Sequence, residues 1–142
     1  MSRPSRRLRA PGTDLTISSC VLAVHDLDEA LGFYRDVLGF EVRADGESEA
    51  ARRVSVGPRS QPDVQISLCV PSADRQTARD LMAGGLLVRR LTFATDDCDA
   101  TFERIEAAGA EVMQEPIDQP HGVRDCAFLD PSGNLLRFSR PR

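Results

Sequence analysis

Hydrophobic and polar positions follow the same order in two segments of the chain, 20–42 and 91–112. Each segment opens with a short apolar run, which predicts a strand, and continues with an acidic turn. Each ends in a Glu-Val pair that predicts the start of another strand. Between them, apolar residues recur at helical spacing: Ala30, Leu31, Phe33, Tyr34, Val37 and Leu38 in the first segment, and Phe102, Ile105 and Ala108 in the second. The two segments lie about half the chain apart, which indicates a duplicated module.

The helix of each segment is expected to begin at an aspartate and to end at a glycine. Asp28 and Asp99 are candidate N-caps, because a carboxylate can accept a hydrogen bond from a free N–H group of the first turn. Gly39 and Gly109 stand where the helical patterns stop. A further short helix is predicted over 74–82, between the two segments.

Two more strands follow each copy, at 53–56 and 64–70 in the first and at 125–129 and 135–139 in the second. The order β-α-β-β-β, found twice, predicts an α+β fold. It favours two small, curved antiparallel sheets, each backed by a helix, over a doubly wound parallel sheet. The predicted organisation is a single domain, 14–142, made of module one (14–71), a linker (72–87) and module two (88–142). A basic arm, 1–13, is expected to be disordered.

Alternation along the last strand raises the question of what Arg137 faces. Leu136 and Phe138 share one face, whereas Arg137 points to the other. The same alternation places Arg90 away from the apolar residues of its own strand.

Composition and charge exclude several classes of protein. The 142 residues carry a formal net charge of −4 at pH 7, so no general basic surface for nucleic acid is expected. No apolar run approaches the roughly 20 residues that span a bilayer. The basic N-terminal segment is followed by no apolar stretch, unlike a secretory signal. None of the four cysteines form a C-x-x-C pair, which favours buried, reduced thiols and a cytoplasmic location.

Three motifs resemble those of the vicinal oxygen chelate superfamily: VHDLDEALGFYRDVLGFEV, ATDDCDATFERIEAAGAEV and DPSGNLLRFS. This superfamily includes glyoxalase I, extradiol dioxygenases, methylmalonyl-CoA epimerase, and the fosfomycin- and bleomycin-resistance proteins. The resemblance covers roughly residues 15–140. It implies paired half-barrels around a cavity, a small-molecule ligand and a homodimer. Whether the cavity closes within one chain or across two is left open.

The resemblance also implies where a metal ion would bind in the metal-using members. Those positions hold Ser19, Arg90 and Arg137 here, and either Ser67 or Gln65. A guanidinium group is cationic and offers no lone pair to a metal. We therefore expect no metal cofactor, with a divalent metal as the alternative.

The two arginines allow two interpretations. They pair with protein carboxylates such as Glu49 or Asp63, or extend to water. Alternatively, they bind a carboxylate, phosphate or enolate group of a ligand.

The segment QPHGVRDCAF adds two candidate residues near the expected mouth of the cavity. Arg124 is a candidate ligand-binding residue. His121 is a candidate acid or base, because the unperturbed pKa of histidine lies near neutrality. The alternative for His121 is an exposed loop residue without a catalytic role.

The leading hypothesis is a metal-independent small-molecule-binding protein of the bleomycin-resistance type, which holds an anionic ligand through Arg90 and Arg137. Ser19, Gln65, Ser67 and Arg124 are the other predicted ligand-binding residues. With no Trp, one Tyr and six Phe, the chain offers few residues for stacking a large aromatic drug. The alternative is an enzyme of the same superfamily, with or without a metal, acting as a lyase, isomerase or dioxygenase.

Overall fold

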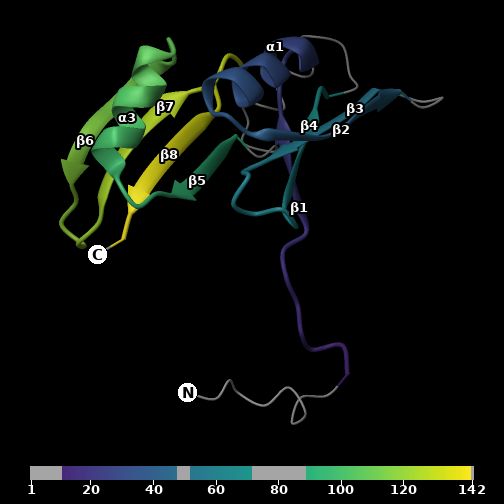
Figure 1. Ribbon diagram of the computed structural model, residues 1–142, viewed down its shortest axis with the longest axis horizontal. Helices are drawn as coiled ribbons and strands as arrows, with labels where there is room; N and C mark the ends of the chain where they lie inside the picture. Colours follow the sequence, from purple (N-terminus) through teal and green to yellow (C-terminus); the bar gives the residue numbers. More distant parts are fainter. Residues whose placement is uncertain (1–10, 48–51, 72–88, 142) are drawn as a thin grey trace.

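The computed structural model describes residues 11–47, 52–71 and 89–141 (Figure 1). Module one consists of β1 (Ser19–Ala23), α1 (Leu27–Gly32), a π-helical turn η2 (Phe33–Val37), β2 (Glu41–Glu47), β3 (Arg52–Gly57) and β4 (Gln65–Cys69). Module two consists of β5 (Arg90–Ala94), α3 (Cys98–Ala107), β6 (Glu111–Asp118), β7 (Arg124–Leu129) and β8 (Leu135–Arg140). The predicted helix at 74–82, the linker and most of the basic arm lie outside the described residues, so the predicted module boundaries stay predictions.

The two modules form two four-stranded sheets, ordered β1-β4-β3-β2 and β5-β8-β7-β6. This confirms the α+β fold and the tandem β-α-β-β-β modules. The expectation of purely antiparallel sheets is wrong, because β1 pairs with β4, and β5 with β8, in parallel. The helical crossover starts the second strand of each module in the same direction as the first. Two antiparallel pairings then return the fourth strand to that direction, so it pairs with the first strand in parallel.

The N-caps of both main helices lie two residues before the predicted ones. Asp26 accepts a hydrogen bond from the Glu29 N–H at 2.9 Å, and Asp97 accepts one from the Ala100 N–H at 3.0 Å. The predicted caps at Asp28 and Asp99 are therefore wrong. The backbone is already extended at Asp26 and Asp97, which is the conformation a cap requires.

Both helical segments end at glycines, as predicted. Gly39 and Gly109 have φ angles of +75° and +97°, a left-handed conformation that glycine adopts without a steric penalty. None of the helices in the described part of the chain is long and apolar enough to cross a membrane.

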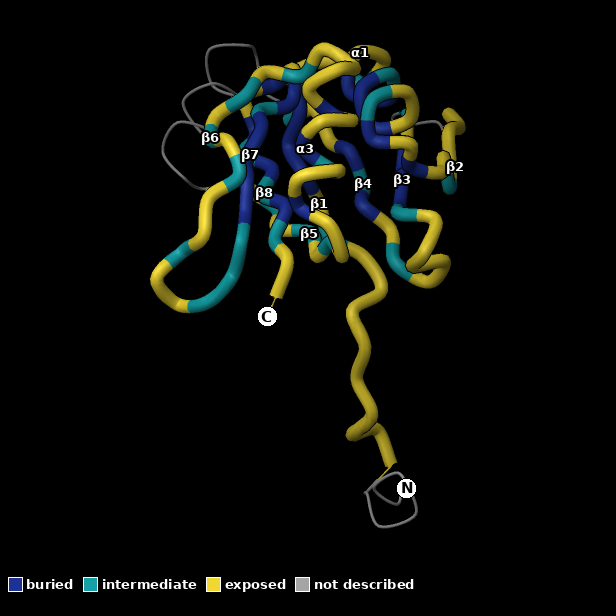
Figure 2. The backbone as a smooth tube through the Cα atoms, turned by 60° about the vertical axis from the view of Figure 1, so that its left-hand side comes forward, coloured by how far each residue is buried: buried dark blue, intermediate teal, exposed yellow. Residues whose placement is uncertain are grey.

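The helix-facing sides of the two sheets meet in one hydrophobic core, shown in dark blue in Figure 2. A row of aromatic rings crosses from module one into module two. The ring centroids of Phe40 and Phe93 lie 5.4 Å apart, as do those of Phe93 and Phe138. Leu136 is fully buried and Phe138 is 5% exposed, so the predicted inward face of β8 is confirmed.

The turn between β7 and β8, residues 130–134, connects the modules through polar contacts. The Tyr34 hydroxyl donates to Asp130 Oδ2 at 2.7 Å, and Asn134 Nδ2 donates to the Ala23 carbonyl at 2.8 Å. The His25 N–H donates to Ser132 Oγ at 2.9 Å. The sequence predicts the turn but not its burial, so the turn is part of the core between the modules.

Candidate functional site

Each sheet has a face turned away from its helix. The open face of module one is defined by Ser19, Val21, Gln65 and Ser67, and the open face of module two by Arg90, Thr92, Arg137 and Ser139. The strand register aligns Ser19 with Gln65 and Val21 with Ser67. In module two it aligns Thr92 with Arg137 and Ala94 with Ser139. Five of the six predicted ligand-binding residues thus lie on these two faces.

Arg137 is held on its open face by two neighbours in the same sheet. Its Nη1 atom donates a hydrogen bond to Gln114 Oε1 at 3.0 Å and lies 3.3 Å from Asp125 Oδ2. The Arg137 side chain is 32% exposed and that of Asp125 is 6% exposed. Asp125 is therefore the partner of Arg137 in place of the expected Asp63, and the other expected partner, Glu49, lies outside the described residues. Asp125 lies on β7 beside β8, a register that the sequence alone does not show.

Asp125 is the buried centre of this polar cluster. Its Oδ1 atom accepts hydrogen bonds from Gln114 Nε2 at 2.7 Å and from Gln119 Nε2 at 3.0 Å. Burial alone would raise the pKa of Asp125, but the hydrogen bonds from Gln119 and Gln114 and the charge of Arg137 hold that pKa below its usual range. Asp125 is therefore ionised at neutral pH, and it fixes the position of Arg137.

Arg90 differs from Arg137 in its surroundings. It is exposed, and no ion pair joins it to any other residue in the described ranges. On the open face of module one, Ser55 Oγ lies 3.2 Å from Gln65 Oε1, and Ser19 and Gln65 are exposed. This face carries hydroxyl and amide groups where module two carries two arginines.

The remaining two predicted residues lie apart from Arg137. Arg124 is on the helix side of β7, where its guanidinium lies 2.9 Å from Asp99 and 3.3 Å from Asp118. The hydrogen bond from Arg124 lowers the pKa of Asp99. His121 is exposed in the turn between β6 and β7, which the Gly122 N–H closes by donating to the Gln119 carbonyl. The geometry therefore brings neither side chain to the two open faces.

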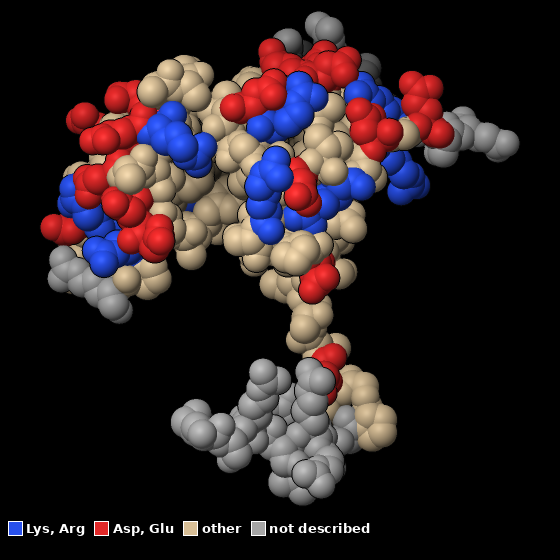
Figure 3. All heavy atoms as spheres, in the orientation of Figure 1, with Lys and Arg blue, Asp and Glu red and all other residues tan. Residues whose placement is uncertain are grey.

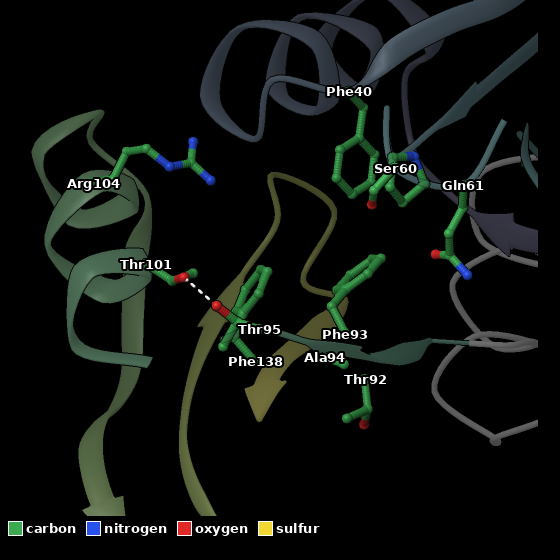
Figure 4. Close-up of a pocket in the computed structure, with 11 residues that line it drawn as sticks. Phe40, Ser60, Gln61, Thr92, Phe93, Ala94, Thr95, Thr101, Arg104 and Phe138 are labelled. Carbon is green, nitrogen blue, oxygen red and sulfur yellow. Dashed lines mark hydrogen bonds between the residues drawn. The ribbon is translucent and has the colours of Figure 1, made fainter. Parts of the chain in front are cut away.

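A pocket that the sequence does not indicate lies between the modules, where the surface is hollowed (Figure 3). Its volume is about 520 Å³. Three rings form its apolar part, and a hydrogen bond of 2.7 Å between the hydroxyls of Thr95 and Thr101 lies at its side (Figure 4). It shares Thr92 with the open face of module two. Its lining comes from five separate segments, which is why no local motif identifies it: Phe40, Pro58, Ser60, Gln61, Thr92, Phe93, Ala94, Thr95, Thr101, Arg104 and Phe138.

The donor chemistry of the open faces does not fit a divalent metal. Such ions bind imidazole, carboxylate or thiolate groups, whereas the matching positions here hold serine, glutamine and arginine side chains. Within the described ranges, no group of three or more His, Cys, Asp and Glu residues is placed to hold a metal ion. The carboxylate in contact with Arg137, that of Asp125, is already bound by Arg137 and two glutamines.

The chain belongs to the glyoxalase/bleomycin resistance protein/dioxygenase superfamily, whose family model matches residues 16–138. The fold described above is the fold of solved members. The structure of UcmS2 is 33% identical, with a TM-score of 0.78, and the match covers 89% of this chain and 98% of that one. TnmS3, an antibiotic binding protein from Streptomyces sp. CB03234, is 26% identical, with a TM-score of 0.73 and coverage of 92% and 98%.

Two of the curated relatives carry enzyme names. A probable lactoylglutathione lyase of Vibrio parahaemolyticus is 30% identical over 123 residues, which are 83% of this chain and 85% of that one. A putative glyoxylase, CFP32, of Mycobacterium tuberculosis is 41% identical over 49 residues, 34% of this chain. The matched part spans 19% of the length of CFP32.

Proposed function

We propose that this protein is a metal-independent small-molecule-binding protein that holds its ligand on the open faces of the two modules. One observation carries the proposal: Gln114 and Asp125 hold Arg137 on the open face, at the position where the resemblance to metal-using members implies a ligand to the ion. In this proposal Arg90 and Arg137 bind an anionic, oxygen-rich group of the ligand. Ser19, Gln65 and Ser67 supply hydrogen bonds from module one.

The relatives favour a natural-product antibiotic as the class of ligand. TnmS3 is an antibiotic binding protein, and the anthracycline biosynthesis protein DnrV of Streptomyces peucetius is 49% identical over 41 residues, 15% of its length. The scarcity of exposed aromatic rings favours a ligand held by hydrogen bonds and ion pairs over one held by stacking. Sequestration of such a ligand requires no catalytic residue.

We also propose a homodimer in which the open faces are covered. Ile17 and Val21 are 76% and 54% exposed in the single chain, and both lie on or next to the open face of module one. Apolar side chains of this size are normally covered when they line a binding cavity. Light scattering on the purified protein tests this, and a monomeric mass at micromolar concentration contradicts it.

A cytoplasmic location is part of the proposal. Cys20, Cys69, Cys98 and Cys126 are free thiols in the structure, which is typical of proteins kept in a reducing compartment.

The second candidate function is an enzyme of the superfamily, favoured by the likeness to the probable lactoylglutathione lyase. A metal-free lyase or isomerase would use Arg90 or Arg137 to stabilise an oxyanion and His121 to move a proton, although His121 lies away from both open faces in the single chain. Turnover that is lost in His121→Gln supports this alternative over simple binding.

Metal content is the first measurement. The protein is purified without chelator and incubated with zinc, nickel, manganese or ferrous iron before mass spectrometry. We expect less than about a tenth of an equivalent, because arginine at these positions repels a cation. A stoichiometric metal contradicts the proposal and directs the work to glyoxalase, epimerase and dioxygenase assays.

Ligand binding is the second test. A thermal-shift screen of antibiotics and small carboxylates is followed by titration of Arg137→Leu, with Arg140→Leu on the same strand as the control. We expect Arg137→Leu to lose binding of an anionic hit while remaining folded. Unchanged affinity in that variant removes Arg137 from the site.

A further inference from the structure

Arg137 uses only part of its guanidinium group for contacts within the protein. Nη1 makes both, at 3.0 Å to Gln114 Oε1 and 3.3 Å to Asp125 Oδ2. In the ranges that the structure describes, no residue accepts a hydrogen bond from Nε or Nη2. With 32% of the side chain exposed, these N–H groups remain available as oriented donors on the open face of module two.

The charge of Arg137 is balanced by a buried carboxylate. Asp125 is 4% exposed, and two glutamine amides hold its second oxygen, Oδ1, at 2.7 and 3.0 Å. Because both side chains are ionised at neutral pH, the pair has no net charge. An anion placed against Arg137 would also approach the Asp125 carboxylate, and the repulsion would cancel much of the attraction.

Arg90 lies on the same face but has no such partner among the described residues. In the strand register Arg90 is opposite Leu135, whereas Arg137 is opposite Thr92, so the two arginines belong to neighbouring pairs on the open face. Arg90 is exposed, and its charge is not balanced by a carboxylate in this sheet. The two arginines therefore present different chemistry to the same ligand.

We infer that Asp125 is a positioning residue that makes Arg137 a donor for a neutral acceptor oxygen of the ligand, such as a carbonyl or hydroxyl oxygen, and leaves recognition of a negative charge to Arg90. This inference rests on the proposed function, because it assigns parts of the ligand to residues of the proposed site. It refines the proposed site, in which both arginines bind the oxygen-rich group of the ligand: Arg90 binds its negative charge, and Arg137 binds a neutral oxygen beside that charge.

Inorganic phosphate tests how the charge is divided without knowledge of the ligand. The arginine Nε–H resonances are followed by ¹⁵N NMR in the wild-type protein and in Asp125→Asn. Asparagine keeps the size of the side chain and can still accept a hydrogen bond from a glutamine. We expect phosphate to shift the Arg90 resonance and not that of Arg137 in the wild type. In Asp125→Asn we expect phosphate to shift the Arg137 resonance as well. The affinity of Arg137 for phosphate should be at least about tenfold higher than in the wild type, a change equivalent to ~1.4 kcal/mol.

Two phosphate results overturn the inference. One is a wild-type Arg137 that responds to phosphate as strongly as Arg90, and the other is an Arg137 that stays unresponsive in a folded Asp125→Asn. If this variant does not fold, the wild-type comparison of Arg90 and Arg137 decides. Arg140→Gln, on the same strand, is the matched control for loss of one arginine charge and should leave both responses unchanged.

A pair of probes connects the inference to ligand binding. 2-Naphthoate and 2-naphthamide share a ring and a carbonyl group and differ by one charge. We expect Arg90→Gln to weaken the binding of naphthoate only, and Arg137→Gln to weaken the binding of both probes. In Asp125→Asn, the affinity for naphthoate relative to naphthamide should rise by about tenfold. If both bind and this ratio is unchanged in Asp125→Asn, the inference alone is overturned. If neither binds the wild type at about 1 mM, the phosphate comparison decides the inference, and the proposed function fails only if the screen of antibiotics and small carboxylates also gives no hit.

Discussion

The hydroxyl group of Tyr34 is expected to stabilise the whole domain, because it joins the modules through a buried charged hydrogen bond. Tyr34 is fully buried and Asp130 is 5% exposed, and the distance from the Tyr34 hydroxyl to Asp130 Oδ2 is 2.7 Å. Burial and the neighbouring Asp130 carboxylate raise the pKa of Tyr34. The hydroxyl therefore remains protonated, and so a donor, at every pH at which the protein is studied. Tyr34→Phe removes this donor and keeps the ring.

The expected loss can be estimated from the contacts that remain. A hydrogen bond to a charged group contributes about 1.5–3 kcal/mol. Asp130 Oδ2 still accepts a hydrogen bond from Asn134 Nδ2 at 2.9 Å, so the carboxylate is not left without a partner. The ring of Tyr34 keeps its contacts with Phe33 and Phe40, and no large cavity forms. We therefore expect Tyr34→Phe to lower the free energy of unfolding by about 2 kcal/mol.

Urea unfolding followed by circular dichroism measures this loss, and Thr101→Val is the matched control. That variant removes a neutral, half-buried hydroxyl whose partner is the Thr95 hydroxyl at 2.7 Å, at an expected cost of about 0.5–1.5 kcal/mol. The reasoning is refuted if Tyr34→Phe costs no more than the control, since the bond to Asp130 would then contribute nothing beyond an ordinary hydroxyl contact.

Three further predictions concern acid stability, thiol reactivity and the turn at 130–134. The lowered pKa of Asp125 means that its interactions stabilise the fold above the unfolded-state pKa of about 3.9 and are lost as the pH falls through the lower folded-state value. Asp125→Asn should therefore flatten the dependence of the urea midpoint on pH below about pH 4, and an unchanged slope contradicts this. Burial raises the pKa of Cys126 to about 12, whereas Cys69 is exposed. A thiol reagent at pH 8 should accordingly modify Cys69 in the native protein and Cys126 only after unfolding, as peptide mass spectrometry can show. Gly133 has a φ angle of +82°, and a Cβ there would lie 2.9 Å from the Arg89 guanidinium. We expect Gly133→Ala to lower the free energy of unfolding by about 1 kcal/mol or more, and a neutral effect in thermal denaturation would argue against strain in this turn.

Periodicity within single segments predicts most of the fold. The repeat of 20–42 and 91–112 predicts both modules, and the alternation of Leu136, Arg137 and Phe138 predicts the two faces of β8 correctly. These patterns are local, because each depends only on residues close together in the sequence. The sequence pattern places both N-caps two residues too late in the chain, because each acidic turn offers more than one aspartate that could act as the cap.

Contacts between side chains of paired strands account for what the sequence does not predict. Asp125 becomes the partner of Arg137 only through the pairing of β7 with β8, and Gln114 joins them only through the pairing of β6 with β7. The expectation that all four cysteines are buried is also wrong, because Cys69 lies on the outward side of β4. The apolar character of a strand predicts that one side is covered, but not which polar groups meet on the other.

The contacts of the 130–134 turn set the order of events during synthesis of the chain. Tyr34 and its acceptor Asp130 are 96 residues apart, and Ala23 and Asn134 are 111 residues apart. At about 5–20 residues per second, the ribosome makes the second partner roughly 5–20 s after the first. During that interval, the Tyr34 hydroxyl of the nascent module one lacks its acceptor Asp130, and the Ala23 carbonyl lacks its donor Asn134. Module one can therefore reach its final packing only after nearly the whole of module two has been translated.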